Sequence, residues 1–264
     1  MVLRQRAVSA FVFVIGILVL LAMGSFGLNL LLLTIILGIS FEYFRLMRVS
    51  HNLIYVYMVL VVVLYAFAIF QDFITPFIMY FVVMTIVFHL YFIYLMLFNS
   101  ARSLVKAMRN TGFIYPLCSV LTLALVLPLA EDPGLLTLGL LILIWTCDSM
   151  AYLVGRKLGK TRLFERVSPK KTWEGIYGAI VGTMLVALLL YPILGLYNYT
   201  FWIIMAVLVV VFGTLGDLIQ SHIKRQFNVK DSGNLMPGHG GFWDRFDSFV
   251  FLLPFVSLLI LLYS

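Results

Sequence analysis

The chain has 264 residues, of which 63% are hydrophobic and only 11% are charged. Soluble domains usually carry about 25% charged residues, so this composition excludes an ordinary water-soluble fold. The formal net charge is +7. Two cysteines, Cys118 and Cys147, fall within apolar stretches and have no metal-ligand spacing, so they predict buried packing rather than a disulfide framework or a metal site.

Nine stretches of the chain are apolar and are about as long as a bilayer-crossing helix, which needs about 20 mostly apolar residues. They cover residues 8–23, 26–40, 53–70, 74–98, 113–129, 135–153, 175–196, 201–219 and 246–263. The sequence therefore predicts an all-α polytopic membrane protein with about nine transmembrane helices. The first stretch lacks a convincing cleavage site, so we expect a retained helix rather than a signal peptide. Because the first two stretches are short, a single re-entrant hairpin is the alternative interpretation of that pair.

All 18 lysines and arginines lie either before the first stretch or in every second loop after it. Basic residues near the ends of spans are retained on the cytoplasmic side of a membrane. We therefore expect a cytoplasmic N-terminus and a C-terminus on the opposite side. The positive charge belongs to the cytoplasmic face, where it suits anionic lipid headgroups or phosphorylated solutes. Nucleic acid is not an expected partner.

Charged residues divide the chain into two unequal parts. Residues 1–112, which hold the first four stretches, carry almost no charge within the membrane, and we assign them a scaffolding role. Seven of the eleven acidic residues fall between Trp145 and Asp247. We therefore expect residues 113–264 to form the catalytic region, with long cytoplasmic loops at 154–174 and 220–245.

Small residues at helical spacing mark the faces of two predicted helices. Gly213 and Gly216 lie in the eighth stretch, and Gly178 and Gly182 lie in the seventh. Small residues let neighbouring helices approach closely in a membrane, so we expect tight helix contacts at both places. Such glycine-rich faces also leave a homodimer as an expectation.

Asp217 lies where the eighth stretch leaves the apolar region, in the run GTLGDLIQSHIKR. Ionisable groups at this depth are costly and are usually functional. At helical spacing, Asp217 shares one face with Gln220, Ser221 and Lys224. The alternative interpretation is a carboxylate that pairs with Lys224 or Arg225 and only helps to set the topology.

The run SHIKRQFNVKDSGNLMPGHGGFWDRFD, at residues 221–247, concentrates charges and glycines in an otherwise apolar chain. Asp244 and Asp247 are three residues apart, so both would project from one side of the first turn of the last helix. Simple capping of that helix is the alternative. Capping does not explain why these carboxylates and Asp231 accompany five basic side chains: Lys224, Arg225, His239, Lys230 and Arg245. Carboxylates with phosphates completing the shell suit Mg²⁺, and basic groups hold the remaining phosphate oxygens.

The run SPKKTWEG precedes the seventh stretch. Ser168 is a plausible N-cap and Pro169 suits the first helical position, so Lys170 and Lys171 would lie in the first turn of a helix. Cations there oppose the helix dipole, and an anion bound at this helix end would relieve the conflict. The alternative is a pair of lysines that only obey the orientation rule. Asp148 ends the sixth stretch on the same cytoplasmic side.

The pattern in residues 221–247 resembles the signature of the CDP-diacylglycerol synthases, also called phosphatidate cytidylyltransferases. The segments DSMAY, at residues 148–152, and SPKKTWEG, at residues 168–175, are also similar to family segments. The matching signature positions are Ser221, Ile223, Lys224, Arg225, Lys230, Asp231, Gly233, Pro237, His239, Gly240, Gly241, Phe242, Asp244, Arg245, Phe246 and Asp247. In the first part of the chain the resemblance is only architectural.

The resemblance implies an enzyme of phospholipid biosynthesis that converts CTP and phosphatidate to CDP-diacylglycerol and pyrophosphate. The distribution of Lys and Arg, rather than the resemblance, places the expected active site on the cytoplasmic face, and we expect a bacterial-type inner membrane. Asp217 and Asp244 are the first expected ligands of Mg²⁺, and Asp247 and Asp231 come next. Asp148 would orient a ligand or hold a second cation. The lipid phosphate would attack the α-phosphorus of CTP in line, which needs positioning and charge neutralisation more than a protein nucleophile.

Basic and hydroxyl side chains complete the predicted site. Ser168 and Ser221 would make polar contacts to phosphate or nucleotide. His239 would contact a phosphate, assist a proton transfer or brace the glycine loop, and these roles stay open. The residues expected to bind phosphate are Lys170, Lys171, Lys224, Arg225, Lys230 and Arg245.

Two other functions fit part of this pattern. A CTP-dependent polyprenol or phytol kinase has a related hydrophobic plan, but it would transfer the γ-phosphoryl group and release CDP. The long match over residues 221–247 disfavours it. A transporter of an anionic solute would carry charges near the membrane midplane, broken helices and repeat symmetry. Here the charges gather at one face instead.

Overall fold

The computed structural model describes residues 2–70, 75–111, 114–235 and 240–264. Apart from one short hairpin, the secondary structure of these residues is helical. The elements are α1 (Val2–Ala22), α2 (Gly24–Leu46), α3 (His51–Phe70), α4 (Thr75–Phe98), α5 (Ala101–Thr111), η1 (Ile114–Cys118), α6 (Ser119–Val126), η2 (Leu127–Leu129), α7 (Pro133–Leu158), β1 (Arg162–Phe164), β2 (Ser168–Thr172), α8 (Trp173–Leu194), α9 (Tyr199–Leu208), η3 (Val209–Gly213), α10 (Thr214–Gln226) and α11 (Trp243–Tyr263). The predicted class, an all-α polytopic membrane protein, is confirmed.

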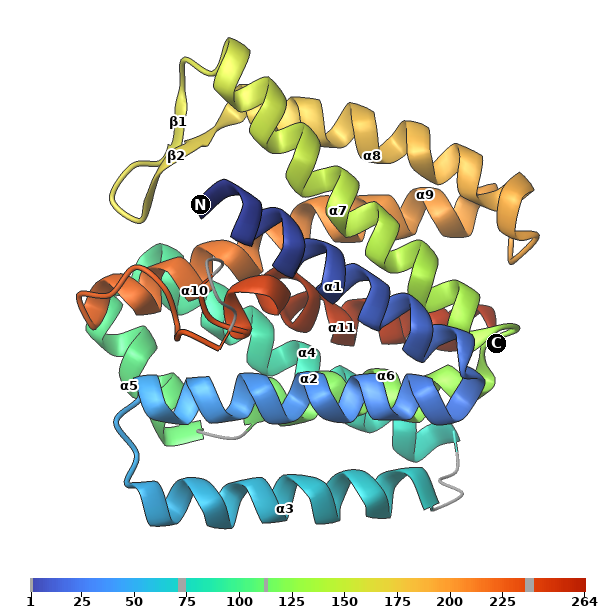
Figure 1. Ribbon diagram of the computed structural model, residues 1–264, viewed down its shortest axis with the longest axis horizontal. Helices are drawn as coiled ribbons and strands as arrows, with labels where there is room; N and C mark the ends of the chain where they lie inside the picture. Colours follow the sequence, from blue (N-terminus) through green and yellow to red (C-terminus); the bar gives the residue numbers. More distant parts are fainter. Residues whose placement is uncertain (1, 71–74, 112–113, 236–239) are drawn as a thin grey trace.

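The number of spans differs from the expected nine. In the described residues, seven helices are long and apolar enough to cross a membrane, or eight if the bent pair Arg102–Thr111 and Tyr115–Leu129 counts as one span. The first predicted stretch contributes a shorter apolar helix, Phe11–Ala22. Nine crossings therefore stay a prediction, as does the orientation of the termini in the membrane. Figure 1 shows the N-terminus at the same end of the bundle as the hairpin and the C-terminus at the opposite end.

Two helices continue beyond the apolar stretches that predicted them. The apolar stretch that ends near residue 219 lies in a helical segment that continues to Gln226, through α9, the π-helical η3 and α10. Likewise, α7 continues to Leu158, beyond the expected end at residue 153. Helical hydrogen bonding outlasts the apolar stretch at both places, because α7 ends with Arg156 and Lys157 and α10 ends with Lys224 and Arg225 in the last turn. Cations are favourable near the C-terminus of a helix.

The last helix, α11, lies in the middle of the bundle in Figure 1, with other helices on both sides. In its apolar window 78% of the residues are buried, against 50% or less in the other spans. Gly216 of α10 gives α11 room, because a Cβ atom there would lie 2.5 Å from Cβ of Phe251 and 3.0 Å from the carbonyl oxygen of Asp247. The close helix contact predicted at Gly216 is confirmed.

The helices α7 and α8 form a second closely packed pair. A Cβ atom at Gly178 would collide with Val154, and one at Gly182 would collide with Met150. The small-residue face predicted for this helix therefore packs against α7. The hairpin strand β2, which follows α7 and precedes α8, lies toward the same end of the bundle as the start of α11 (Figure 1).

The run SPKKT is a β-strand and not the first turn of a helix, so the prediction for Ser168 was wrong. Residues Ser168–Thr172 form β2, which pairs antiparallel with β1 through Phe164 with Ser168 and Arg162 with Thr172. The N-cap of α8 is Thr172, whose hydroxyl accepts from the backbone N–H of Gly175 at 3.2 Å. Threonine is a good N-cap, and Pro169 is tolerated in a short edge strand, so the helix begins four residues later than expected.

Candidate active site

A cavity of about 450 Å³ opens at the end of the bundle where α7, β2, α10 and the start of α11 meet. Twelve of the fourteen predicted site residues line it. They are Asp148, Lys170, Lys171, Asp217, Ser221, Lys224, Arg225, Lys230, Asp231, Asp244, Arg245 and Asp247. Ser168 lies in β2 and is not among the described residues that line the cavity. His239 lies outside the described residues.

Asp217 is bound by Lys171 from across the cavity. The distance between Nζ of Lys171 and Oδ2 of Asp217 is 2.6 Å, and the hydroxyl of Ser221 donates to Oδ1 at 3.2 Å. Asp217 stands in the first turn of α10, directly after η3, and π-helical segments inside helices are frequent at functional sites. The ion-pair partner is therefore a lysine of the hairpin, while Lys224, which the topological interpretation named, also interacts with Asp217 electrostatically.

Lys224 connects α10 to the start of α11. Its ammonium group donates to Oε1 of Gln220 at 2.7 Å and to Oδ1 of Asp244 at 2.8 Å. The helical face predicted for Asp217, Gln220, Ser221 and Lys224 is thus confirmed by two contacts, each four residues apart. The side chains of Lys224 and Asp244 are only 11% and 6% exposed, so solvent screens this ion pair weakly.

The carboxylate of Asp244 also organises the loop before α11. Its Oδ2 accepts from the backbone N–H of Ser232 at 2.8 Å and from that of Gly241 at 2.9 Å. Asp244 thus joins the two ends of the glycine-rich segment while its other oxygen binds Lys224. Most of its acceptor capacity is already used within the protein.

Three other carboxylates face one another across the cavity from three helices. Asp148 of α7, Asp217 of α10 and Asp247 of α11 lie close enough to interact electrostatically. In the described part of the chain, no group of three or more His, Cys, Asp or Glu side chains has the arrangement of a metal site. Mg²⁺ is usually held by one or two carboxylates together with substrate phosphates and water, rather than by an all-protein cage. The donor set therefore fits Mg²⁺ in kind, and its binding stays a prediction.

The exposed edge of the cavity is basic. Lys170, Arg225, Lys230 and Arg245 are exposed and line it. Arg245 of α11 interacts electrostatically with Asp148 of α7, so charged groups of these two helices are coupled across the cavity. Five aspartates and six basic residues thus share one cavity, and such a cavity can bind anions and a divalent cation together.

Glu42 contacts the loop beside the cavity, and the sequence analysis missed it. It lies in α2, within the region assigned to a scaffold, and is only 2% exposed. Its carboxylate accepts hydrogen bonds from the hydroxyl of Ser232 and from the backbone N–H groups of Phe242 and Trp243. The available signal was an acidic residue directly after the second apolar stretch, because an ionisable group at such a place is rarely without a partner.

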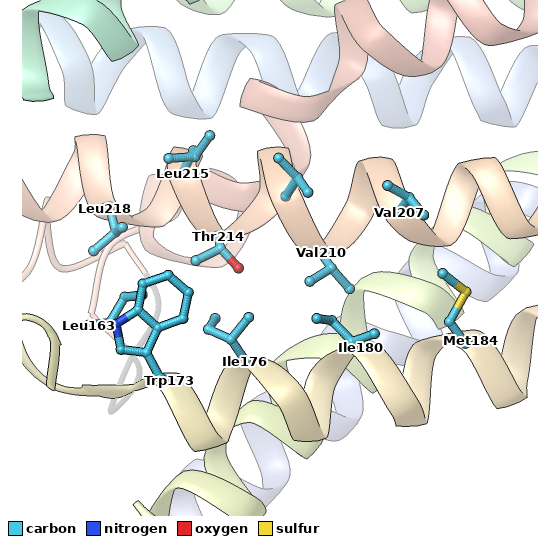
Figure 2. A pocket seen from close by; sticks show the side chains of 11 residues that line it. Leu163, Trp173, Ile176, Ile180, Met184, Val207, Val210, Thr214, Leu215 and Leu218 are labelled. Carbon is cyan, nitrogen blue, oxygen red and sulfur yellow. The ribbon is translucent and has the colours of Figure 1, made fainter. Parts of the chain in front are cut away.

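An apolar groove of about 400 Å³ lies beside the charged cavity. Ile176 and Thr214 line both. Figure 2 shows Ile176 and Ile180 of α8 facing Val210 and Thr214 across the groove. The full lining is Leu163, Trp173, Ile176, Ile180, Met184, Val207, Val210, Val211, Thr214, Leu215 and Leu218. The structure therefore places a polar and an apolar binding surface side by side.

A family model described as the cytidylyltransferase family matches residues 4–263. This chain belongs to the cytidylyltransferase family. The family assignment made from the signature residues is thereby confirmed, and it extends to the N-terminal helices, where the sequence offered only an architectural likeness.

Curated members of this family are similar to the chain over part of its length. The phosphatidate cytidylyltransferase of Bacillus subtilis (strain 168) is 46% identical over 124 residues, which cover 47% of this chain and 46% of that protein. The phosphatidate cytidylyltransferases of Staphylococcus epidermidis (strain RP62A) and Staphylococcus aureus (strain COL) are 44% and 43% identical over 122 residues, 46% of each chain. The chain thus spans about half the length of the curated relatives it matches.

Proposed function

We propose that this cytidylyltransferase-family chain transfers the cytidylyl group of CTP to phosphatidate, which yields CDP-diacylglycerol and pyrophosphate. One observation carries the proposal: a cavity lined by five aspartates and six basic residues adjoins an apolar groove, with Ile176 and Thr214 lining both. The two substrates are both anionic, and one of them carries acyl chains. A site for their reaction must therefore neutralise phosphate charge and accept hydrocarbon at the same place.

The chemistry requires no protein nucleophile. An oxygen of the lipid phosphate attacks the α-phosphorus of CTP and forms a new P–O bond. The bond between the α-phosphorus and the oxygen that bridges to the β-phosphate breaks, and its electron pair leaves with pyrophosphate. A phosphate monoester is largely ionised at neutral pH, so no general base is needed to create the nucleophile. The protein has to align the two reactants and offset their charge.

Lysines held by aspartates supply the first part of that charge. Asp217 orients Lys171, and Gln220 and Asp244 orient Lys224, so both ammonium groups have restricted positions. Preorganised donors of this kind stabilise charge without a cost of reorganisation during the reaction. The exposed residues Lys170, Arg225, Lys230 and Arg245 bind the more distal phosphates of CTP in this proposal, and Ser221 contributes a hydroxyl.

Mg²⁺ is part of the proposal. Asp217 and Asp247 would hold it, with Asp148 facing them from α7, because Asp244 is engaged by Lys224 and two backbone N–H groups. Direct ligation by Asp244 or Asp231, and a second cation, stay predictions. When bound, Mg²⁺ would supply Lewis-acid neutralisation of phosphate oxygens.

The apolar groove is the proposed site for one acyl chain of phosphatidate. It lies between α8 and the segment from Val207 to Leu218, and it meets the charged cavity at Ile176 and Thr214 (Figure 2). Lys171, which also contacts the carbonyl oxygen of Thr214 at 3.5 Å, stands at this junction. A lipid lying in the groove would present its phosphate to Lys171.

The membrane side and the assembly also belong to the proposal. We place the cavity at the cytoplasmic face of a bacterial-type inner membrane, because every Lys and Arg precedes the first predicted span or lies in loops of one side. A membrane-impermeant thiol reagent applied to intact cells should then label a cysteine placed at Glu131 and spare one placed at Lys230. A homodimer remains a prediction. Size-exclusion chromatography with light scattering measures the molar mass of the assembly and so tests it.

Product analysis with two radioactive forms of CTP tests the function. The purified chain in mixed micelles receives phosphatidate, Mg²⁺ and CTP labelled at either the α- or the γ-phosphorus. Lipid labelled only from α-labelled CTP, with release of pyrophosphate, supports the proposal. Lipid labelled from γ-labelled CTP when a polyprenol or phytol replaces phosphatidate indicates the kinase. Saturable anion uptake into vesicles without turnover indicates the transporter. Asp217→Asn is the inactive control.

A further inference from the structure

Glu42 is a buried acidic residue that binds neutral donors from a distant part of the chain. Its Oε2 accepts from the hydroxyl of Ser232 at 2.6 Å and from the backbone N–H of Trp243 at 2.9 Å. Its Oε1 accepts from the backbone N–H of Phe242 at 2.8 Å. These partners lie about 200 residues further along the chain, so the contacts join the N-terminal helices to the loop before α11.

The carboxylate caps the start of α11 from outside that helix. Phe242 occupies the N-cap position and has no polar side chain that could accept a hydrogen bond from the first turn. Glu42 therefore takes over two N–H groups at this helix end, where a negative charge is also favoured by the helix dipole. Gly38, one turn earlier in α2, leaves room for the ring of Phe242. The start of α11 therefore packs against the surface of α2.

Glu42 also holds the other end of the loop. Ser232 precedes the segment 236–239 that lies outside the described residues, and Gly241 follows it. A Cβ atom at Gly241 would collide with both the hydroxyl of Ser232 and the carboxylate of Glu42. The absence of a side chain at Gly241 is therefore what lets the two loop ends close around the carboxylate.

Two carboxylates bind the ends of this loop. Asp244 accepts from the backbone of Ser232 and Gly241 and faces the cavity, where it binds Lys224. Glu42 is not one of the described residues that line the cavity. It contacts the residues next to Asp231 and Asp244, and so it acts on the cavity through them.

We propose that Glu42 is a positioning residue for cytidylyl transfer: it fixes the loop ends that hold Asp231 and Asp244 at the cavity. The role in turnover rests on the proposed function, whereas the fixing of the loop does not. A residue that orients the groups of an active site typically changes activity about 10- to 100-fold when it is replaced.

The test uses Glu42→Gln in the full chain and two measurements. Glutamine keeps the size of the side chain but loses the charge and turns one acceptor into a donor. The kcat for CTP and phosphatidate, per folded molecule counted by size-exclusion chromatography, should fall about 10- to 100-fold, with the KM for CTP within about threefold. Trypsin cleavage after Lys230 in the folded protein should become about 10-fold faster relative to cleavage after Arg166 of the hairpin, because the loop opens more often. Glu42→Asp, which keeps the charge, should recover part of both losses.

Glu131→Gln is the matched control. Glu131 accepts from the backbone N–H of Tyr197 at 3.2 Å, at the opposite end of the bundle, so both measurements should match the wild type. A wild-type kcat in Glu42→Gln, or an unchanged cleavage rate after Lys230, overturns the proposal. If Glu42→Gln does not fold, Ser232→Ala takes its place, because it removes one of the three donors to Glu42. The kcat and the cleavage rate after Lys230 should then change in the same directions by smaller factors, and the same criteria apply. A wild-type chain without turnover refutes the proposed function instead, and the cleavage rates alone then decide whether Glu42 fixes the loop.

Discussion

The helices α3 and α11 have nearly the same length and are both strongly apolar, yet they occupy opposite environments. In α3 only 22% of the residues in the apolar window are buried, whereas in α11 the share is 78%. Figure 1 shows α3 at the edge of the bundle and α11 in its middle. By mean hydropathy α3 is even the more apolar of the two. Apolar composition therefore predicts that a helix crosses the membrane but does not predict which helix forms the centre.

The difference follows from what each helix must hold at its end. Side chains of α3 such as Tyr55 and Val59 are more than 60% exposed and suit contact with lipid tails. The first two turns of α11 carry Asp244 and Asp247, whose carboxylates face the cavity. Charged groups at this depth need partners, and only a helix surrounded by others can receive them from several sides. The site is therefore built around the most enclosed helix.

The largest effect is expected at the cavity that α10 and α11 share. Asp217→Asn removes the charge that binds Lys171 and should lower kcat about 10²- to 10³-fold, as the loss of a preorganised electrostatic group does. Steady-state kinetics measures it. Asp132→Asn is the control, because Asp132 caps α7 at the other end and asparagine caps a helix equally well. Turnover of Asp217→Asn at the wild-type rate would show that the reaction does not depend on the Asp217 carboxylate.

A leucine-to-alanine pair tests the packing difference directly. Leu253 of α11 is fully buried, and Leu53 of α3 is 50% exposed. Leu253→Ala should lower the free energy of unfolding by about 2 kcal/mol, the low end for buried leucines, because lipid tails are as apolar as leucine and mainly packing is lost. Leu53→Ala should cost less than about 0.5 kcal/mol. Unfolding in mixed micelles measures both, and equal losses would contradict the central place of α11.

The contact between α10 and α11 is tested by adding one methyl group. Gly216→Ala places a Cβ atom against Phe251 and the backbone of Asp247, so we expect a loss of about 1–2 kcal/mol and a lower kcat. Gly16→Ala in α1 is the control, because nothing lies within 4 Å of a Cβ atom there. Thermal unfolding compares the two variants. A neutral Gly216→Ala would show that the helices can separate without consequence.

The smallest effect concerns the groove. Ile180→Trp should obstruct it and raise the KM for long-chain phosphatidate about fivefold, equivalent to about 1 kcal/mol, while the KM for CTP stays unchanged. Ile193→Trp, on the same helix but 71% exposed and outside the groove, should leave both KM values unaltered. If the KM for long-chain phosphatidate and the KM for short-chain phosphatidate are both the same in Ile180→Trp as in the wild type, the groove is excluded as the acyl site.

Local patterns in the sequence predicted the contacts that depend on one helix. The spacing of Asp217 and Ser221 is enough to place both on one face, and the structure contains that hydrogen bond. The prediction for Ser168 failed because two residues, Ser168 and Thr172, could each cap a helix. Pairing of β2 with β1 decided in favour of Thr172. That pairing is a contact outside the predicted helix, so capping rules alone could not include it.

The sequence by itself determined the membrane class, the placement of every Lys and Arg before the first apolar stretch or in alternate loops, and the segments that contribute acids to the cavity, because these depend on composition and short-range spacing. Only the tertiary structure decided that Lys171 binds Asp217, that α11 lies at the centre and that Glu42 contacts the loop before α11. Such contacts link residues up to 201 positions apart. The burial that makes each of them necessary exists only once the helices have packed.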